Sequence, residues 1–248
     1  MEKQDILKAL KEVKEKSPSR AFTQTVDLVI NLQYINIKKE DEKIDLFISL
    51  PVSKNKKPKI CAIVDKQLES QAKANFDKVI LKDEFQKYSA NKKEIRKIAR
   101  EYDYIVAQAN LMVQIATVFG KYLGAKGKMP NPKAGCIIPP EANLTPLKTR
   151  LQNLIRLVTK GEPIIKAALG DEKMSDEDLA ANALAIYNAL INQLPQRKNN
   201  IKSVFVKLSM GPSYKIGQGL KIKEKTKNLK EEIKEKTAEV KKEKKSKK

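Results

Sequence analysis

Apolar residues recur along this chain with two different periods, and the first one is helical. Ile6, Leu10 and Val13 lie three or four positions apart within residues 3–16, which predicts an amphipathic helix. A Ser-Pro pair follows directly. Because proline keeps the residue before it in extended backbone, we expect the helix to end there.

The next stretches have a period of two. Every second residue over 22–32 is apolar except Gln24, which predicts a strand with one buried face. The same alternation over 44–50 predicts another strand. After a long interruption, strands are predicted again over 162–170 and 201–211. Between these two lies a helical pattern that begins after Ser175, a residue type that caps helix N-termini.

The middle of the chain has short, continuously apolar runs, which are typical of strands covered on both faces. These runs are 59–64, 79–81, 102–108 and 136–138. Helical patterns lie between and after them, over 91–101, 111–123 and 146–160. Alternating strands and helices favour a parallel α/β unit. The patterns before and after this middle part therefore indicate one α+β unit, into which the α/β unit is inserted.

Charge is the strongest compositional signal. The 248 residues hold 51 Lys and Arg against 30 Asp and Glu, a formal net charge of +21. A chain this basic usually has a polyanionic partner, and nucleic acid is the first candidate. Residues 221–248 are a lysine-rich tail with few apolar positions, so we expect a disordered or weakly helical extension.

Several chemistries have little support in the composition. The chain has no His and two cysteines, Cys61 and Cys136, which are not in a CxxC pair. A zinc site and a disulfide framework are therefore disfavoured, and we expect no metal and no cofactor. No apolar run is long enough for a membrane span, and the N-terminus lacks a signal-like apolar core. We expect a cytoplasmic protein.

The sequence GKYLGAKGKMPNPKAG at 120–135 combines glycines, prolines and lysines as phosphate-binding loops do. It does not fit the known patterns. If Gly127 and Lys128 were the Gly-Lys pair of a Walker loop, the motif would need a glycine at 122 and a Ser or Thr at 129. The chain has Tyr122 and Met129 there. The glycine spacing also fails the GxGxxG dinucleotide fingerprint. What remains is a stiff basic loop that either neutralises phosphates or braces the preceding helix.

Three blocks of the chain resemble the ribosomal protein L-one family, the universal large-subunit proteins of the lateral stalk. LGAKGKMPNPKAG (123–135) is similar to the family signature LGPRGLMPNPKxG. VFVKLSMGPSYKI (204–216) resembles the closing strand with its (Thr/Ser)-Met-Gly-Pro motif, and SRAFTQTVDLVINL (19–32) resembles the first strand. The blocks stand in family order, and their character suggests an archaeal member.

The resemblance implies an α/β fold in which a split α+β domain carries an inserted Rossmann-like α/β domain without a nucleotide site. Domain one would comprise 1–58 plus 161–220, domain two would comprise 59–160, and 221–248 would be the tail. The main RNA surface would lie on domain one.

The residues expected at that RNA surface lie in or beside the blocks 19–32 and 204–216 and on the strand predicted over 162–170. They are Arg20, Phe22, Thr25, Lys166, Lys207, Ser209, Met210, Gly211 and Pro212. Phe22 has an alternative role in the core, since it continues the apolar alternation. The loop of domain two would have a secondary RNA role or a structural one, through Lys126, Lys128, Asn131 and Lys133.

The resemblance implies a non-catalytic structural protein of the large ribosomal subunit, a monomer within the ribosome. Its partners would be the stalk segment of large-subunit rRNA near the tRNA exit site, its own mRNA, whose translation it would repress, and transiently deacylated tRNA. Two alternatives remain open: a nucleotide-dependent enzyme built on the α/β domain, and a nonspecific basic coat protein of nucleic acid.

Overall fold

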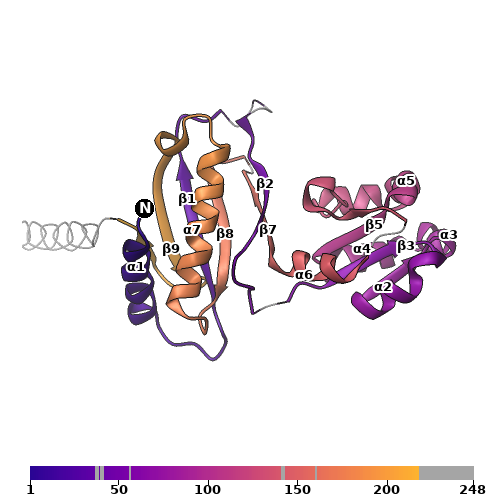
Figure 1. Ribbon diagram of the computed structural model, residues 1–248, viewed down its shortest axis with the longest axis horizontal. Coiled ribbons are helices and arrows are strands. Elements are labelled where there is room, and N and C mark those ends of the chain that lie inside the picture. Colours follow the sequence, from indigo (N-terminus) through magenta and orange to yellow (C-terminus); the bar gives the residue numbers. More distant parts are fainter. Residues whose placement is uncertain (37–38, 40–41, 56, 141–142, 160, 218–248) are drawn as a thin grey trace, which may run out of the picture.

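The computed structural model describes residues 1–36, 39, 42–55, 57–140, 143–159 and 161–217, and two folding units occupy the ends of its long axis (Figure 1). The first, called the split unit below, combines both ends of the described chain. It contains α1 (Lys3–Lys16), β1 (Thr25–Leu32), β8 (Ile164–Asp171), α7 (Asp176–Gln193), β9 (Ile201–Leu208) and β10 (Ser213–Lys215).

The second, called the inserted unit, contains the chain between them. Its strands are β3 (Ile60–Val64), β4 (Lys78–Leu81), β5 (Tyr104–Gln108) and β6 (Ile137–Ile138). Its helices are α2 (Glu69–Asn75), α3 (Phe85–Ala90), α4 (Lys92–Glu101), α5 (Met112–Ala125) and α6 (Thr145–Asn153). In the described part of the chain, no helix is both long enough and apolar enough to span a bilayer.

The sheet of the split unit is antiparallel, with the strand order β10-β9-β1-β8. β1, from the start of the chain, therefore lies between strands that follow the inserted unit. Its alternate residues Val26, Leu28 and Ile30 are fully buried. They pack under α1 and α7, which cover the same face of the sheet (Figure 1). The side-chain hydroxyl of Ser175 accepts from the Asp178 amide and caps α7 as predicted.

The sheet of the inserted unit is parallel, with the order β4-β3-β5-β6. All five residues of β3 are buried, because helices cover both of its faces. One face packs against α3, α4 and α5 around Phe119, and the other against α2 and α6 around Leu144. The predicted α/β fold is confirmed.

A two-stranded antiparallel ribbon joins the units. It consists of β2 (Asp45–Ser49) and β7 (Leu154–Val158). Its residues alternate between the two cores: Ile155 and Ile48 enter the core of the split unit, whereas Leu154 and Phe47 pack with the inserted unit. Each face of the ribbon is thus buried against a different unit.

The helix predicted over 146–160 is wrong in its second half. α6 ends at Asn153, and the chain continues as β7. The leucine spacing fits a helix, but the backbone of 154–158 pairs with β2, and Leu154, Ile155 and Leu157 are buried in this strand. Tertiary pairing overrides the local pattern here. The domain boundaries inferred from the sequence stay a prediction. The predicted tail, 221–248, lies outside the described residues.

A buried amide fixes the segment after β2 to the split unit. Asn182, on α7, is fully buried. Its side chain donates to the carbonyls of Leu169 (2.9 Å) and Val52 (3.1 Å) and accepts from the Val52 amide (3.1 Å). Both the backbone and the asparagine are satisfied in a place that water does not reach.

Replacing Asn182 by alanine should therefore destabilise the protein by about 2–4 kcal/mol, because it leaves buried backbone groups unpaired. Urea unfolding followed by circular dichroism measures this change. Asn188→Ala, at an exposed position of the same helix, is the matched control and should change the free energy of unfolding by less than about 0.5 kcal/mol. Equal losses in both variants would refute the role of this amide.

Candidate nucleic-acid interface

The face of the split sheet opposite the helices is not filled with core residues. Its side chains alternate with the buried ones along each strand and are partly or fully exposed. The polar and charged members are Thr25, Asp27, Asn31, Lys166, Asp171, Ser203, Lys207, Ser213 and Lys215. We call this set the open face.

Two predicted lysines lie on the open face on either side of β1. Lys166 of β8 is paired with Val29, and Lys207 of β9 is paired with Asp27. Adjacent strands are about 4.8 Å apart, so the two lysines stand two strands apart across the middle of the sheet. Phe205 pairs with Val29 and supplies an apolar surface between the polar positions.

Asp27 was missed by the sequence reasoning. It lies at the centre of the open face, and burial raises the pKa of its carboxyl, against the opposing effect of the nearby Lys207 charge. A carboxylate that the fold partly desolvates at a central surface position is a signal of function. The sequence contained this signal: Asp27 is a charged residue within an otherwise apolar and uncharged strand pattern.

The Ser-Met-Gly-Pro turn follows β9 and is attached to the start of β1. The amide and hydroxyl of Ser209 both donate to the Thr25 carbonyl, at 3.0 and 3.2 Å. The Met210 amide donates to the side-chain oxygen of Gln24 at 3.1 Å. Gln24 is buried, and its carbonyl accepts from the Glu172 amide. The one polar residue that interrupts the apolar alternation therefore ties three segments together.

Gly211 is a glycine for a packing reason. A Cβ atom built on it would lie 2.6 Å from the hydroxyl oxygen of Ser17 and 3.2 Å from the Leu208 Cβ. The missing side chain thus leaves room for the end of α1. A valine here would disturb the turn as well as any ligand.

Phe22, in the loop before β1, and Met210, in the turn after β9, both have exposed side chains. Phe22 is 56% exposed and Met210 62%. The alternative core role of Phe22 is therefore wrong: β1 begins at Thr25, and the alternation before it lies in a loop. Arg20 and Pro212 are also exposed on these segments.

The structure thus brings most of the predicted residues to one end of the split sheet. Thr25, Ser209, Met210 and Gly211 are joined by hydrogen bonds or turn contacts. Lys166 and Lys207 lie farther along the open face. Cations, hydroxyls and exposed apolar side chains are the combination that binds phosphates, ribose and bases of RNA.

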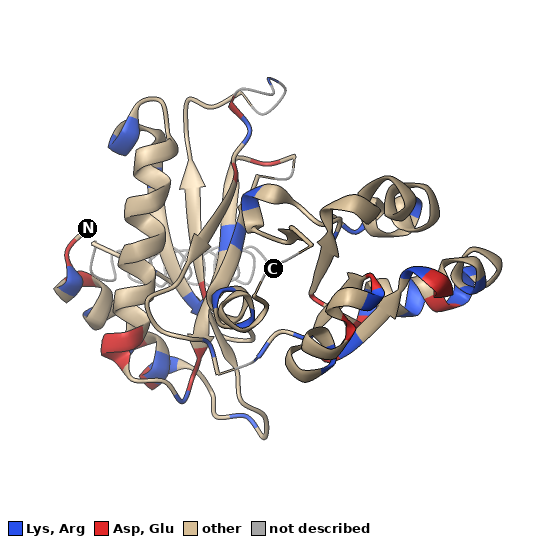
Figure 2. Cartoon of the chain, turned by 45° about the vertical axis from the view of Figure 1, so that its right-hand side comes forward, with Lys and Arg blue, Asp and Glu red and all other residues tan. Residues whose placement is uncertain are grey.

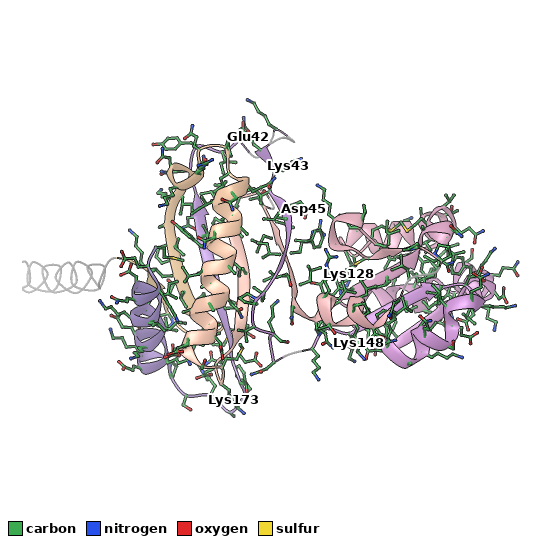
Figure 3. The ribbon with its side chains drawn as sticks, in the orientation of Figure 1. Glu42, Lys43, Asp45, Lys128, Lys148 and Lys173 are labelled. Atoms are coloured by element: carbon green, nitrogen blue, oxygen red, sulfur yellow. The ribbon has the colours of Figure 1, made fainter. Side chains whose placement is uncertain are left out.

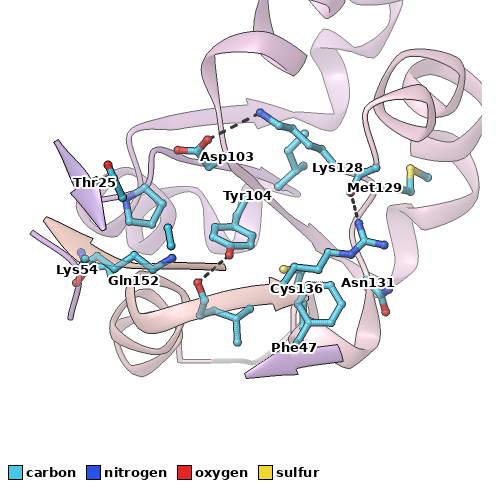
Figure 4. Close-up of a pocket in the computed structure, with 18 of the residues that line it drawn as sticks. Thr25, Phe47, Lys54, Asp103, Tyr104, Lys128, Met129, Asn131, Cys136 and Gln152 are labelled. Atoms are coloured by element: carbon cyan, nitrogen blue, oxygen red, sulfur yellow. Dashed lines mark hydrogen bonds and ion pairs between the residues drawn. The ribbon is translucent and has the colours of Figure 1, made fainter. Parts of the chain in front are cut away.

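The signature loop of the inserted unit is mainly an internal brace. Arg156 of β7 donates two bonds of 2.7 Å to the Asp45 carboxylate, which lower the pKa of Asp45, and a third of 2.7 Å to the Gly127 carbonyl. Its guanidinium also lies over the Phe47 ring. Figure 3 labels Asp45 on the ribbon and Lys128 in the loop, and Figure 4 shows Lys128 in close-up.

Other loop residues are also used internally. The Lys128 ammonium donates to the Tyr102 carbonyl at 2.6 Å and is partly buried. The Asn131 side chain accepts from the Lys133 amide at 2.9 Å. Lys126 is different: it is exposed and lines a groove of about 800 Å³ that Lys166 also lines. The loop and the open face therefore share one groove.

A second hollow of about 460 Å³ lies between the units, lined by residues of both (Figure 4). Tyr104 lines it, and its hydroxyl donates to the Leu154 carbonyl at 2.9 Å.

The two cysteines are buried thiols. Burial raises the pKa of Cys61 to about 12 and that of Cys136 to about 11, so both thiols are protonated at neutral pH. Among the described residues, no cluster of three or more metal-binding side chains occurs.

Comparison with known proteins identifies a family and several relatives of this chain. The profile of the ribosomal protein L1p/L10e family matches residues 10–212. "Large ribosomal subunit protein uL1" of Thermococcus kodakarensis is 37% identical over 216 residues, which cover 87% of this chain and 98% of that relative. The protein of the same name from Methanothermococcus thermolithotrophicus is 38% identical, covering 87% of this chain and 99% of that relative.

The same name is carried by a Nanoarchaeum equitans protein that is 38% identical over 201 residues, 79% of this chain and 92% of the relative. The family profile and these relatives place the chain among the ribosomal proteins. The chain belongs to the ribosomal protein L1p/L10e family, in its archaeal form.

The first prediction from this site concerns Asp27. Its raised pKa means that the carboxylate destabilises the fold once it ionises, so this cost is absent at low pH and appears as the pH rises through the pKa of the folded state. Asp27→Asn should therefore raise Tm at pH 7, and the difference should vanish near about pH 4.

Scanning calorimetry over a pH series measures this effect. Glu15→Gln removes an exposed carboxylate from α1 and serves as the control, with an unchanged Tm. A lower Tm for Asp27→Asn at pH 7 would mean that the attraction of Lys207 outweighs burial, against our interpretation.

The second prediction concerns the loop. Gly127 has a φ of +65°, and an added Cβ would lie 3.2 Å from the Arg156 guanidinium. Gly127→Ala should cost about 1–2 kcal/mol of stability, because it strains the backbone and displaces the arginine. Gly124→Ala is the matched control: it lies in α5 with open space around it and should gain up to about 1 kcal/mol. Chemical denaturation distinguishes the two, and a neutral Gly127→Ala would refute the brace.

Proposed function

We propose that this protein is a non-catalytic structural constituent of the large ribosomal subunit that binds the lateral-stalk segment of large-subunit rRNA near the tRNA exit site. The family match and the relatives named as large-subunit proteins support the ribosomal role. The stalk segment comes from the family resemblance. On this proposal, the protein acts in the ribosome of the cytoplasm.

The observation that carries the proposal is the exposure of Phe22 and Met210 beside a cationic sheet face. Two large apolar side chains, each more than half exposed, cost free energy in water unless a partner covers them. Both come from short segments that hydrogen bonds hold in place. Their flat or flexible apolar surfaces suit a base or a ribose.

Each group at this end of the sheet has a distinct role in the proposal. Lys166, Lys207 and Arg20 neutralise phosphates and supply the salt-dependent part of the affinity. The hydroxyl of Ser209 already donates to Thr25, so its free lone pairs accept from a ribose 2′-OH. Asp27 accepts from a 2′-OH or a base amino group, which would account for a carboxylate on a basic surface.

The further partners follow from the same face. An mRNA segment that folds like the stalk would bind there and be repressed, so the protein would regulate its own synthesis. Deacylated tRNA would be a transient partner as it leaves the ribosome. In both cases the protein would recognise the RNA partner by its shape and its exposed bases.

The two competing functions make different predictions. A nucleotide-dependent enzyme would need a phosphate loop, but 120–135 fits no such motif, and within it Gly127 lies against Arg156, which donates to its carbonyl. A nonspecific coat protein would bind every RNA alike through charge, and its affinity would collapse with salt. A specific complex retains an affinity gap of several kcal/mol over random RNA.

Replacing both Phe22 and Met210 by alanine should weaken binding to a stalk rRNA fragment about 10- to 100-fold, since stacking and apolar contacts contribute about 1–3 kcal/mol per base. Equilibrium binding at two salt concentrations measures it. A scrambled hairpin of equal length should lose less than about threefold, because its binding depends on phosphates.

The matched control removes two large, even more exposed side chains elsewhere. Tyr34→Ala with Val113→Ala should bind the stalk fragment as the wild type does; these positions are 77% and 79% exposed. If the Phe22/Met210 variant bound the stalk fragment normally, or if both RNAs weakened equally, the proposed interface would be refuted.

A further inference from the structure

Helix α4 of the inserted unit carries an unusual concentration of positive charge. Its ten residues, KKEIRKIARE, include five cations and two carboxylates. The apolar residues Ile95, Ile98 and Ala99 are buried against the parallel sheet, so the cations occupy the solvent side. The cationic members at i, i+3, i+4 and i+7 are Lys93, Arg96, Lys97 and Arg100.

These four cations are not neutralised by the protein. Within the described residues, none of their side chains lies within 4.0 Å of a carboxylate. Glu94 accepts from the Asn91 side chain at 2.9 Å, and Glu101 pairs with Lys59. Lys73 on α2, by contrast, forms an i,i+4 ion pair on its own helix. The charge on α4 is therefore available to an external ligand.

One member of the row is held in position by an aromatic ring. The Arg96 guanidinium lies 5.5 Å from the centre of the Tyr122 ring on α5. Stacking on an aromatic face orients the guanidinium and leaves its N–H edge free to donate. The four cations and Glu101 together line a hollow of about 450 Å³ on the helix surface.

The spacing of the row matches a phosphate backbone. A helix rises 1.5 Å per residue, so Lys93 to Arg100 spans about 10 Å. Cations spread over this length can contact successive phosphates of one RNA strand and release their counterions. A membrane surface fits less well, because the exposed side of α4 offers no apolar residue to insert.

We propose that α4 is a second RNA-binding surface, which holds the phosphate backbone of an RNA segment other than the one bound at the open face. The proposal rests on the proposed function in one respect only: the open face must bind RNA for this segment to be the second. The two surfaces lie on different units, at the two sides of the junction ribbon, so one chain can hold two RNA segments at once (Figures 1 and 2).

The test uses the full chain, first saturated with the stalk rRNA fragment and then titrated with a labelled 20-base-pair RNA duplex of unrelated sequence. The variant replaces Lys93, Arg96, Lys97 and Arg100 by glutamine. It should bind the stalk fragment as the wild type does and bind the duplex about tenfold more weakly. The salt dependence of duplex binding, as a log–log slope, should fall by about 3.

A charge-matched control removes four exposed lysines from the split unit, on and near the helices that cover the other side of its sheet. Its substitutions are Lys3→Gln, Lys8→Gln, Lys11→Gln and Lys173→Gln. Lys173 is labelled at the lower end of the split unit in Figure 3. This control should lose less than about threefold for the duplex. Equal losses in both variants would mean that net charge alone acts, and would overturn the proposal.

Crosslinking locates the contact independently of affinity. Cys61 and Cys136 are both buried, so Lys97→Cys provides a single accessible thiol for a photoactivatable aryl azide. We expect it to crosslink to the duplex and not to the stalk fragment, whereas Lys11→Cys crosslinks to neither. A crosslink to the stalk fragment would assign α4 to the first site and overturn the proposal.

The remaining outcomes separate the two proposals. If polyglutamate displaced the duplex at equal charge concentration, the surface would fit an acidic protein and the RNA assignment would fail. If the wild type did not bind the stalk fragment specifically, the proposed function would fail. The titration and the Lys97→Cys crosslink to the duplex would then still decide whether α4 binds RNA.

Discussion

The structure depends on one strand pairing: β1, from the start of the chain, is hydrogen-bonded on both edges to strands that follow the inserted unit. This pairing closes the split unit around its core and makes the insertion a side branch of a complete sheet. It also aligns the start of β1 with the end of β9, so that Thr25 accepts both hydrogen bonds of Ser209. The candidate interface exists only because residues about 180 positions apart meet at this corner.

The junction of the two units relies on a different principle. Alternate residues of a two-stranded ribbon enter the two cores, so neither unit can release the ribbon without exposing apolar surface. Arg156 adds a polar connection from the ribbon to the signature loop through Gly127. The most recognisable motif of the sequence is thus largely devoted to architecture, and the residues proposed for RNA recognition lie on the other unit.

Charge is distributed according to this division. The open face mixes cations with hydroxyls, a carboxylate and exposed apolar groups, which is the composition of a surface that discriminates between ligands. The row on α4 contains cations without such partners and suits a backbone of any sequence. Under the two proposals, a protein with a net charge of +21 uses that charge in two chemically different ways. The open face and the row on α4 lie on different units.

The sequence by itself determined the periodic elements, the α/β class and the surface chemistry of most candidate residues, because alternation and helical spacing follow from burial of one side of each element. It misjudged residues 154–158, and it left the position of Phe22 open between surface and core, because each pattern fits two structures equally well. Only the tertiary structure decided these, together with the central place of Asp27 and the packing role of Gly211 against Ser17. The physical reason is that local spacing specifies which residues share a face, whereas strand pairing between distant segments decides what that face meets.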